Sequence, residues 1–197
     1  MNEEFISVQD RILSSAIDLI SDAGLALLSF ANISMRVNIP EAMIYKYYSD
    51  VNELLQDIVK TYFKFDKGIF KTISSRDCSY LGKIDMYVDS LTSYYENYFT
   101  LSTLILQHEE LLHNTYTRDY VEEGIRNRIE FLTGLFQGAI DNKEITDYFT
   151  AAELANTLCG MFMMYTLDRR IHYRNGQFKS RVIGYVNKWL EHIKVGG

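Results

Sequence analysis

One segment, residues 29–55, constrains the fold of this chain more than any other part of the sequence. It reads as two short helices joined by a tight turn, followed by the start of a longer helix. Four aliphatic residues are spaced so that the two short helices pack against each other: Ile33, Val37, Ile39 and Ile44. Asn38 falls in the turn, where a positive φ is needed, and Pro40 opens the next helix, where its missing N–H does no harm. This arrangement is a helix-turn-helix, whose second helix is sized for a DNA major groove.

The rest of the sequence is also expected to be helical. The chain has 197 residues, of which 47% are apolar, and a single proline. No long run alternates apolar and polar residues, so the pattern favours an all-α protein of one large domain or two small ones. Helices are expected over residues 7–23, 29 or 32 to 37, 40–48, 51–70, 84–99, 100–112, 117–140, 150–173 and 180–194. The expected boundaries are N-caps at Ser7, at Ser29 or Asn32 and at Ser49 or Asp50, a stop at Gly24, a loop over residues 71–82 and a turn around Gly176.

The sequence shows no sign of secretion or membrane insertion. Cys78 and Cys159 lie far apart and form no CxxC pair, which fits a reducing cytosol. The first residues lack the basic start and long apolar run of a signal peptide. The longest nearly apolar run, residues 158–167, is too short to cross a bilayer. We therefore expect a cytoplasmic protein with no membrane contact.

The negative charge is concentrated in the helix-turn-helix region. The net charge of the chain is −6, and residues 1–60 hold nine acidic but only four basic side chains. Neutralisation of phosphates supplies most non-specific affinity for DNA, so this charge opposes DNA binding. Glu41, at the start of the second helix, either accepts a hydrogen bond from a cytosine amino group or repels phosphate.

Between Arg11 and Leu55 the sequence resembles the TetR (tetracycline repressor) family of bacterial transcriptional regulators. The stretch RILSSAIDLISDAG is similar to the first helix of that family. The stretch ISMRVNIPEAMIYKYYSDVNELL is similar to its second helix, turn, recognition helix and the start of its fourth helix. The tyrosine-rich residues 44–48 and the pair Leu54 and Leu55 carry the match. Three positions depart from the family pattern: Asn38 replaces a turn glycine, Glu41 an often basic residue and Val51 a lysine that contacts phosphate.

The resemblance implies an all-α, nine-helix fold in two parts. A helix-turn-helix DNA-binding domain is expected over residues 1–50, and a helical ligand-binding and dimerisation domain over residues 51–197. A helix at residues 51–70 connects the two. The implied partners are double-stranded operator DNA, a small-molecule effector and a second copy of the chain, and no cofactor is implied.

Nine residues of the helix-turn-helix are candidate DNA contacts: Ser29, Arg36, Pro40, Glu41, Ala42, Met43, Tyr45, Lys46 and Tyr47. Lys46 is the only basic residue of the second helix and suits a phosphate or a guanine edge. The hydroxyls of Tyr45 and Tyr47 suit phosphates, which position a protein without reading sequence. The apolar members of the set suit thymine methyl groups, and Ser29 and Arg36 suit the phosphate backbone.

Aromatic residues suggest where a ligand binds. The candidate pocket residues are Tyr87, Tyr94, Tyr95, Tyr98, Phe131, Leu135, Phe162 and Met163. Aromatic and methionine side chains line adaptable apolar sites, and tyrosine hydroxyls orient a ligand. The alternative is an ordinary helical core, although a dry core rarely uses so many tyrosines, because each buried hydroxyl needs a partner.

The last two helices carry long apolar faces that suit a dimer interface. The candidate interface residues are Leu154, Leu158, Met161, Tyr165, Val186, Trp189, Leu190 and Ile193. A pair of helices from each subunit forms a two-fold symmetric interface economically. The alternative is that the core of the single chain takes up part of this surface.

The remaining chemical motifs are weak. His108 and His113 are five residues apart, about 140° around a helix, so a solvated surface is favoured over a metal site. No nucleophile–base arrangement, carboxylate pair or glycine-rich phosphate loop stands out, and an enzyme is not expected. We predict a ligand-responsive, DNA-binding transcriptional regulator that acts as a repressor and leaves its operator when an effector binds. The alternative is a TetR-like ligand- or protein-binding module that has lost DNA binding, which the acidic N-terminal region favours.

Overall fold

The computed structural model describes residues 7–172 and 177–195, and the regular structure in those ranges is helical. The elements are α1 (Val8–Ala23), η1 (Leu25–Leu27), α2 (Phe30–Val37), α3 (Glu41–Ile44), α4 (Val51–Ser74), α5 (Tyr80–Asn97), α6 (Phe99–Ser102), η2 (Thr103–Gln107), α7 (His108–His113), α8 (Arg118–Asp141), α9 (Ala151–His172) and α10 (Phe178–Ile193). Elements labelled η are short 3₁₀ helices. The expected turn around Gly176 lies outside the described residues. The predicted all-α fold is confirmed.

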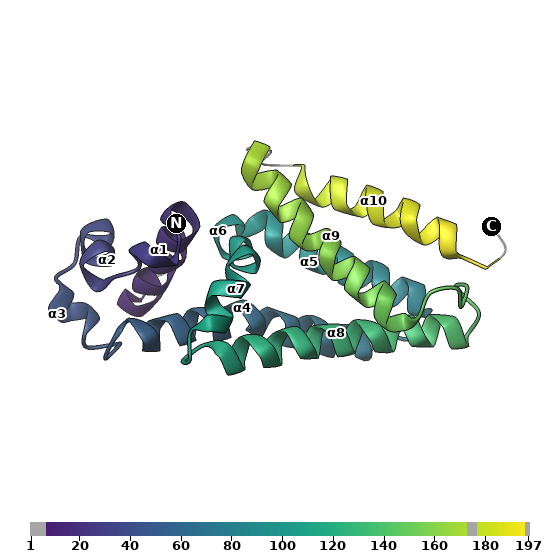
Figure 1. Ribbon diagram of the computed structural model, residues 1–197, viewed down its shortest axis with the longest axis horizontal. Helices are drawn as coiled ribbons and strands as arrows, with labels where there is room; N and C mark the ends of the chain where they lie inside the picture. Colours follow the sequence, from purple (N-terminus) through teal and green to yellow (C-terminus); the bar gives the residue numbers. More distant parts are fainter. Residues whose placement is uncertain (1–6, 173–176, 196–197) are drawn as a thin grey trace, which may run out of the picture.

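The molecule has a small helical head and a longer helical body. Helices α1, α2 and α3 form the head at one end, on the left in Figure 1, and we use that name for residues 7–50. Helix α4 leaves the head and runs into the body beside α8. In the body, α5 and α9 pack on α8, and α10 packs on α5 and α9. The described helices include none long and apolar enough to cross a membrane.

The helix ends of the head follow the expected capping chemistry. The Ser7 hydroxyl oxygen accepts a hydrogen bond from the Asp10 N–H at 3.0 Å, which starts α1. Helix α1 ends at Gly24, whose φ of 83° suits a residue without a side chain. Of the two candidates for the cap of α2, Ser29 is used, because its hydroxyl oxygen accepts from the Asn32 N–H at 3.2 Å.

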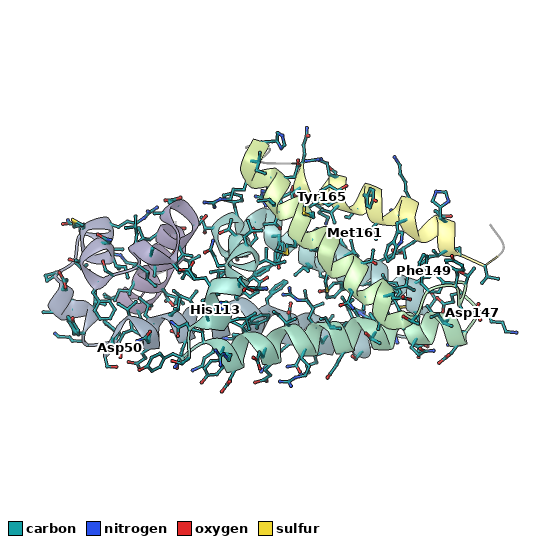
Figure 2. The ribbon with its side chains drawn as sticks, in the orientation of Figure 1. Asp50, His113, Asp147, Phe149, Met161 and Tyr165 are labelled. Carbon is teal, nitrogen blue, oxygen red and sulfur yellow. The ribbon has the colours of Figure 1, made fainter. Side chains whose placement is uncertain are left out.

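The start of α4 is a reciprocal capping box. The Asp50 carboxylate accepts from the Glu53 N–H at 2.9 Å. The Glu53 carboxylate in turn accepts from the Ser49 N–H at 2.7 Å. These bonds fix the direction in which α4 leaves the head. Figure 2 shows Asp50 at this junction.

Two expected helices are shorter or less regular than predicted. The helix expected over residues 40–48 is α-helical only at Glu41–Ile44, because Lys46 and Tyr47 donate to carbonyls three residues back. The helix expected over residues 100–112 is divided into α6, η2 and α7. The Ser102 and Thr103 hydroxyls there donate to the carbonyls of Phe99 and Thr100, at 2.6 and 2.7 Å. Such bonds compete with regular helical bonding.

The expected loop over residues 71–82 is shorter in the structure. Helix α4 continues to Ser74, and α5 begins at Tyr80 after its cap, Ser79. The first turn of α5 has a second cap from a distant part of the chain. The Glu144 carboxylate accepts from the N–H groups of Tyr80 and Leu81 at 3.0 and 2.8 Å.

Helix α8 comes very close to its neighbours at two glycines. A β-carbon on Gly124 would lie 2.4 Å from the Phe63 ring of α4, and one on Gly138 would lie 2.2 Å from the Tyr80 ring of α5. Both distances are too short for any side chain. These glycines therefore set the distances between α8 and its neighbours α4 and α5.

Candidate DNA-contact surface and ligand cavity

The turn between α2 and α3 is built as the sequence predicts. Asn38 has φ 54° and ψ 50°, in the left-handed region, and its N–H donates to the Ser34 carbonyl. The Ser34 hydroxyl donates to the Ile39 carbonyl at 2.6 Å across the turn. The turn is therefore held by both backbone and side-chain bonds, and it presents α3 at the end of the molecule.

The segment after the turn is exposed on one side and anchored on the other. Ala42, Tyr45 and Lys46 are exposed, and the Tyr45 ring packs edge-on against Phe30 with centroids 4.9 Å apart. Ile44 is fully buried in the core of the head. Ile44 anchors this short segment in the head. Its exposed side chains, which include the Tyr45 hydroxyl and the Lys46 ammonium, can therefore enter a groove of a partner molecule.

Tyr48 connects this segment to α4. Its ring is buried, and its hydroxyl donates to the Asp57 carboxylate at 2.7 Å. Burial and this bond raise the pKa of Tyr48 above its ordinary value, so the hydroxyl stays protonated at neutral pH. Tyr48 therefore bonds the segment after the turn directly to α4.

Two of the basic side chains in the head have partners within the head. Arg36 pairs with Asp22 at 2.6 Å, with both side chains substantially exposed. Arg11 donates to the Val37 carbonyl at 3.0 Å, next to the turn. Both contacts connect parts of the helix-turn-helix, and the ion pair with Asp22 reduces the positive charge that Arg36 offers to a polyanion.

A cavity of about 160 Å³ lies in the body between α5, α7, α8 and α9. Its lining residues are Tyr87, Leu91, Ile105, His108, Ile125, Arg128, Ile129, Cys159, Gly160, Phe162 and Met163. Most of this wall is aliphatic or aromatic, with polar groups contributed by Tyr87, His108 and Arg128. A mostly apolar site with a few polar groups is typical of small-molecule pockets.

Two polar atoms at the cavity lack a hydrogen-bond partner among the described residues. They are the Tyr87 hydroxyl oxygen and His108 Nε2. Burial lowers the pKa of His108 to about 3, and the nearby Arg128 charge acts in the same direction, so the imidazole is neutral at pH 7. Burial raises the pKa of Tyr87 well above its ordinary value, so its hydroxyl remains a donor.

A buried ion pair lies beside the cavity and reaches α4. Arg128 of α8 bonds Asp66 of α4 through Nε at 2.9 Å and Nη2 at 2.8 Å. The Tyr62 hydroxyl is 3.5 Å from Arg128 Nη1 and 2.6 Å from the Tyr95 hydroxyl. Burial raises the pKa of Asp66, and the adjacent guanidinium opposes that shift. Through this ion pair the wall of the cavity is bonded directly to α4, the helix that connects the body to the head.

Solved structures of transcriptional regulators share this architecture. The chain matches ketosteroid transcriptional regulator KstR2 of Mycobacterium tuberculosis with a TM-score of 0.82 and 12% identity, covering 96% of each chain. It matches a TetR-family regulator from Agrobacterium tumefaciens with a TM-score of 0.75 and 20% identity, covering 95% of this chain and 97% of that chain. The chain has the TetR-family fold.

A third solved structure with this fold contains a ligand. FadR from Bacillus subtilis, solved in complex with stearoyl-CoA, matches with a TM-score of 0.72 and 15% identity, covering 95% of this chain and 98% of that chain. The sequence matches no protein-family model and no curated protein. The three structural matches confirm the fold that the resemblance at residues 11–55 predicts: the chain has a TetR-family fold over nearly its whole length.

The candidate DNA contacts of this TetR fold gather around the turn and α3. Pro40, Glu41, Ala42, Tyr45, Lys46 and Tyr47 are exposed, and Met43 is half-buried. Ser29 is half-buried, and its hydroxyl oxygen is used to cap α2. Arg36 is exposed but paired with Asp22. Lys46 therefore remains the main candidate for a cationic DNA contact in this set.

The candidate pocket residues are only partly brought together. Tyr87, Phe162 and Met163 line the cavity, whereas Tyr94, Tyr95, Tyr98, Phe131 and Leu135 do not. Tyr95 is buried and bonded to Tyr62, and Tyr98 is 58% exposed. The aromatic stripe of α5 was expected to face one site, but a helix turns its successive residues toward different neighbours.

Five of the eight candidate interface residues are buried within the single chain. Leu154, Leu158, Val186, Leu190 and Ile193 lie in its core and leave no surface for a second subunit. Met161, Tyr165 and Trp189 are half-buried, and Figure 2 shows Met161 and Tyr165 along α9. For these five buried residues, the alternative that the core of the single chain takes up the apolar surface is therefore correct.

The polar centre of the body, formed by His108, Arg128 and Asp66, is not among the sites that the sequence pattern predicts. His108 was expected on a solvated surface but lines the cavity, whereas His113 is exposed. The sequence signal for Arg128 and Asp66 is that each interrupts the apolar stripe of its helix. No group of three or more potential metal ligands occurs within residues 7–172 and 177–195.

Proposed function

We propose that this protein is a ligand-responsive, DNA-binding transcriptional regulator that acts as a repressor. The observation that carries the proposal is the exposed segment after the Asn38 turn, joined through α4 to a cavity with unpaired polar atoms. The solved regulators with this fold support the assignment, and one of them holds stearoyl-CoA. In this proposal residues 1–50 bind DNA, residues 51–197 bind the effector and dimerise, and the protein acts in the cytoplasm.

DNA recognition is assigned to the exposed side of the turn and α3. The Lys46 ammonium contacts a phosphate or a guanine edge, and the Tyr45 and Tyr47 hydroxyls donate to phosphates. Pro40, Ala42 and Met43 contact thymine methyl groups. Ser29 at the start of α2 is suited to a backbone phosphate. Arg36 reaches phosphate when its pair with Asp22 opens.

Helix α4 transmits the ligand signal. Its Asp66 bonds Arg128 at the cavity wall, and its Asp57 accepts from Tyr48 behind the recognition segment. A ligand that changes the position of Arg128 biases α4, and α4 then tilts the head. In a dimer such a tilt changes the spacing of the two heads, and the operator is released.

The dimer surface is assigned to the outer faces of α9 and α10. Met161, Tyr165 and Trp189 lie at the edge of these faces. Met164 and Tyr185 are exposed there by 61% and 50%. A two-fold interface repeats such a patch on both subunits, so each exposed apolar residue contributes twice to the interface.

The test is a titration of purified protein against its own upstream DNA at two salt concentrations. We expect tight binding that weakens with salt, and a smaller salt slope for Lys46→Ala, by about one phosphate contact. Glu41→Lys is expected to tighten binding. Lys71→Ala, an exposed change at the far end of α4, is the matched control and leaves binding unchanged.

The second candidate is a DNA-silent ligand- or protein-binding module. The observation that favours it is the acidic head, in which Arg36 is already paired with Asp22. A folded dimer that binds no DNA at low salt supports this candidate and contradicts the first. A protected operator site excludes it.

A further inference from the structure

Two of the three unpaired polar atoms buried in the described part of the body belong to side chains that line one cavity; the third, Arg169 Nε, lies elsewhere on α9. The Tyr87 hydroxyl and His108 Nε2 are buried without hydrogen-bond partners among the described residues, and both side chains line the cavity. Tyr87 is fully buried. Buried polar atoms in folded proteins are nearly always paired. Two exceptions in one wall indicate a place where a ligand supplies the missing partner.

The volume of the cavity limits the size of that ligand. It is about 160 Å³. An engineered apolar cavity of about 150 Å³ holds benzene, so a ligand of about six to eight non-hydrogen atoms fits this space. A long acyl chain does not fit it. Leu91, Ile105 and Phe162 provide apolar surface for a ring.

The charges around the cavity select a neutral ligand. Arg128 reaches the wall, but its guanidinium is paired with the buried carboxylate of Asp66. A ligand anion has to compete with that carboxylate after losing its own hydration, and a ligand cation lies beside Arg128 without a counter-ion. A neutral molecule avoids both costs.

We propose that the cavity binds a neutral molecule the size of one six-membered ring that carries a single hydroxyl group, as phenol does. Tyr87 donates a hydrogen bond to the ligand oxygen, and His108 Nε2 accepts one from the ligand hydroxyl. Since both side chains are neutral at pH 7, the match requires no change of protonation. This assignment rests on the proposed function, because it names the class of effector, but its test does not involve DNA.

The test compares phenol, benzene and benzoate by calorimetric titration of the full chain. We expect phenol to bind at one site per chain, benzene to bind about 5-fold more weakly, and benzoate to bind least. Tyr87→Phe should lower the affinity for phenol about 5-fold and leave that for benzene unchanged. Tyr98→Phe, the same change at an exposed position outside the cavity, should alter neither.

Modification of the two cysteines gives a second test of where the ligand binds, independent of the calorimetric titration. Cys159 lines the cavity, whereas Cys78 is exposed between α4 and α5. Bound phenol should slow modification of Cys159 by methyl methanethiosulfonate and leave Cys78 unaffected. This readout needs no variant, so a failure of Tyr87→Phe to fold does not prevent the test.

Three results overturn the assignment: phenol does not bind, phenol and benzene bind with equal affinity to wild type and to Tyr87→Phe, or phenol leaves Cys159 unprotected. The third result includes the case in which stearoyl-CoA protects Cys159 and phenol does not. If phenol binds as expected but does not release DNA, the ligand assignment is supported and the proposed regulatory role of the cavity fails.

Discussion

The head and the body of this protein differ in the kind of polar group that they bury. In the head, the buried centre is mostly apolar, with Ile12, Ile33 and Ile44 fully inaccessible. Its capping side chains lie at helix ends, where Ser29 and Asp50 accept from N–H groups three residues away, and the two serines buried in α1, Ser15 and Ser21, carry no charge. In the body, the centre contains a buried ion pair and polar atoms without partners. The head therefore buries no ion pair among its described residues, whereas the body keeps charged and aromatic polar groups at its centre at some cost to stability.

The contrast between head and body is tested most severely by removing one charge of the buried Asp66–Arg128 pair. Asp66→Ala leaves Arg128 buried and unpaired, and should lower the free energy of unfolding by about 3–5 kcal/mol. Asp22→Ala removes the partner of Arg36 in the exposed pair of the head and should cost at most about 1 kcal/mol. Urea unfolding of both variants measures the difference.

A double variant distinguishes the stability lost by leaving one charge unpaired from the stability lost by removing the whole ion pair. Asp66→Leu combined with Arg128→Met removes both charges and fills similar space, so it should recover most of the stability lost in Asp66→Ala. If Asp66→Ala and Asp22→Ala cost the same, the body centre is open to water and the contrast with the head is wrong.

The head core provides the next largest effect. Ile33 is fully buried, and Ile33→Ala should lower the free energy of unfolding by about 3 kcal/mol, because it removes packed methyl groups and leaves a cavity. Ile33→Val should cost about 1 kcal/mol. Thermal unfolding measures both changes. Met35→Ala, a change on the same helix at a position that is 74% exposed, is the control and should have little effect.

The same contrast explains what the sequence could predict. The head was predictable because its signals are local: caps act over three residues, and Asn38 and Pro40 define the turn by their own backbone preferences. The body centre depends on which faces of distant helices meet. Asp66 and Arg128 are 62 residues apart in the chain. The face of α9 that turns inward was decided by packing on α8, so Leu154 and Leu158 were assigned to the wrong surface.

Acid should destabilise the body through His108. The folded-state pKa of about 3 lies below the ordinary value of 6.5, so the unfolded chain binds the proton more readily. Stability is therefore full above pH 6.5 and falls as the pH drops from 6.5 toward 3. The neighbouring charge is Arg128, and the rings of Tyr62 and Phe63 pack on the imidazole.

The His108 effect is measured by comparing wild type with His108→Gln. Between pH 7 and pH 5, wild type should lose about 2 kcal/mol more unfolding free energy than the variant, which cannot titrate at this position. Other groups titrate in both proteins and cancel in the difference. Parallel stability profiles for the two proteins would mean that His108 is solvated, as the sequence alone had suggested.

The smallest predicted effect concerns a cap that only the tertiary structure provides. Glu144 accepts from two N–H groups at the start of α5, although it lies more than 60 residues away in the chain. Glu144→Ala should lower the free energy of unfolding by about 1 kcal/mol, and Glu144→Gln should lower it less. Hydrogen exchange should quicken at Tyr80 and Leu81 and stay unchanged in the head. Asp50→Ala should give the converse pattern, with faster exchange at Glu53, because that cap acts within its own helix. If Glu144→Ala leaves Tyr80 and Leu81 protected, local capping by Ser79 suffices and the body uses the same short-range rules as the head.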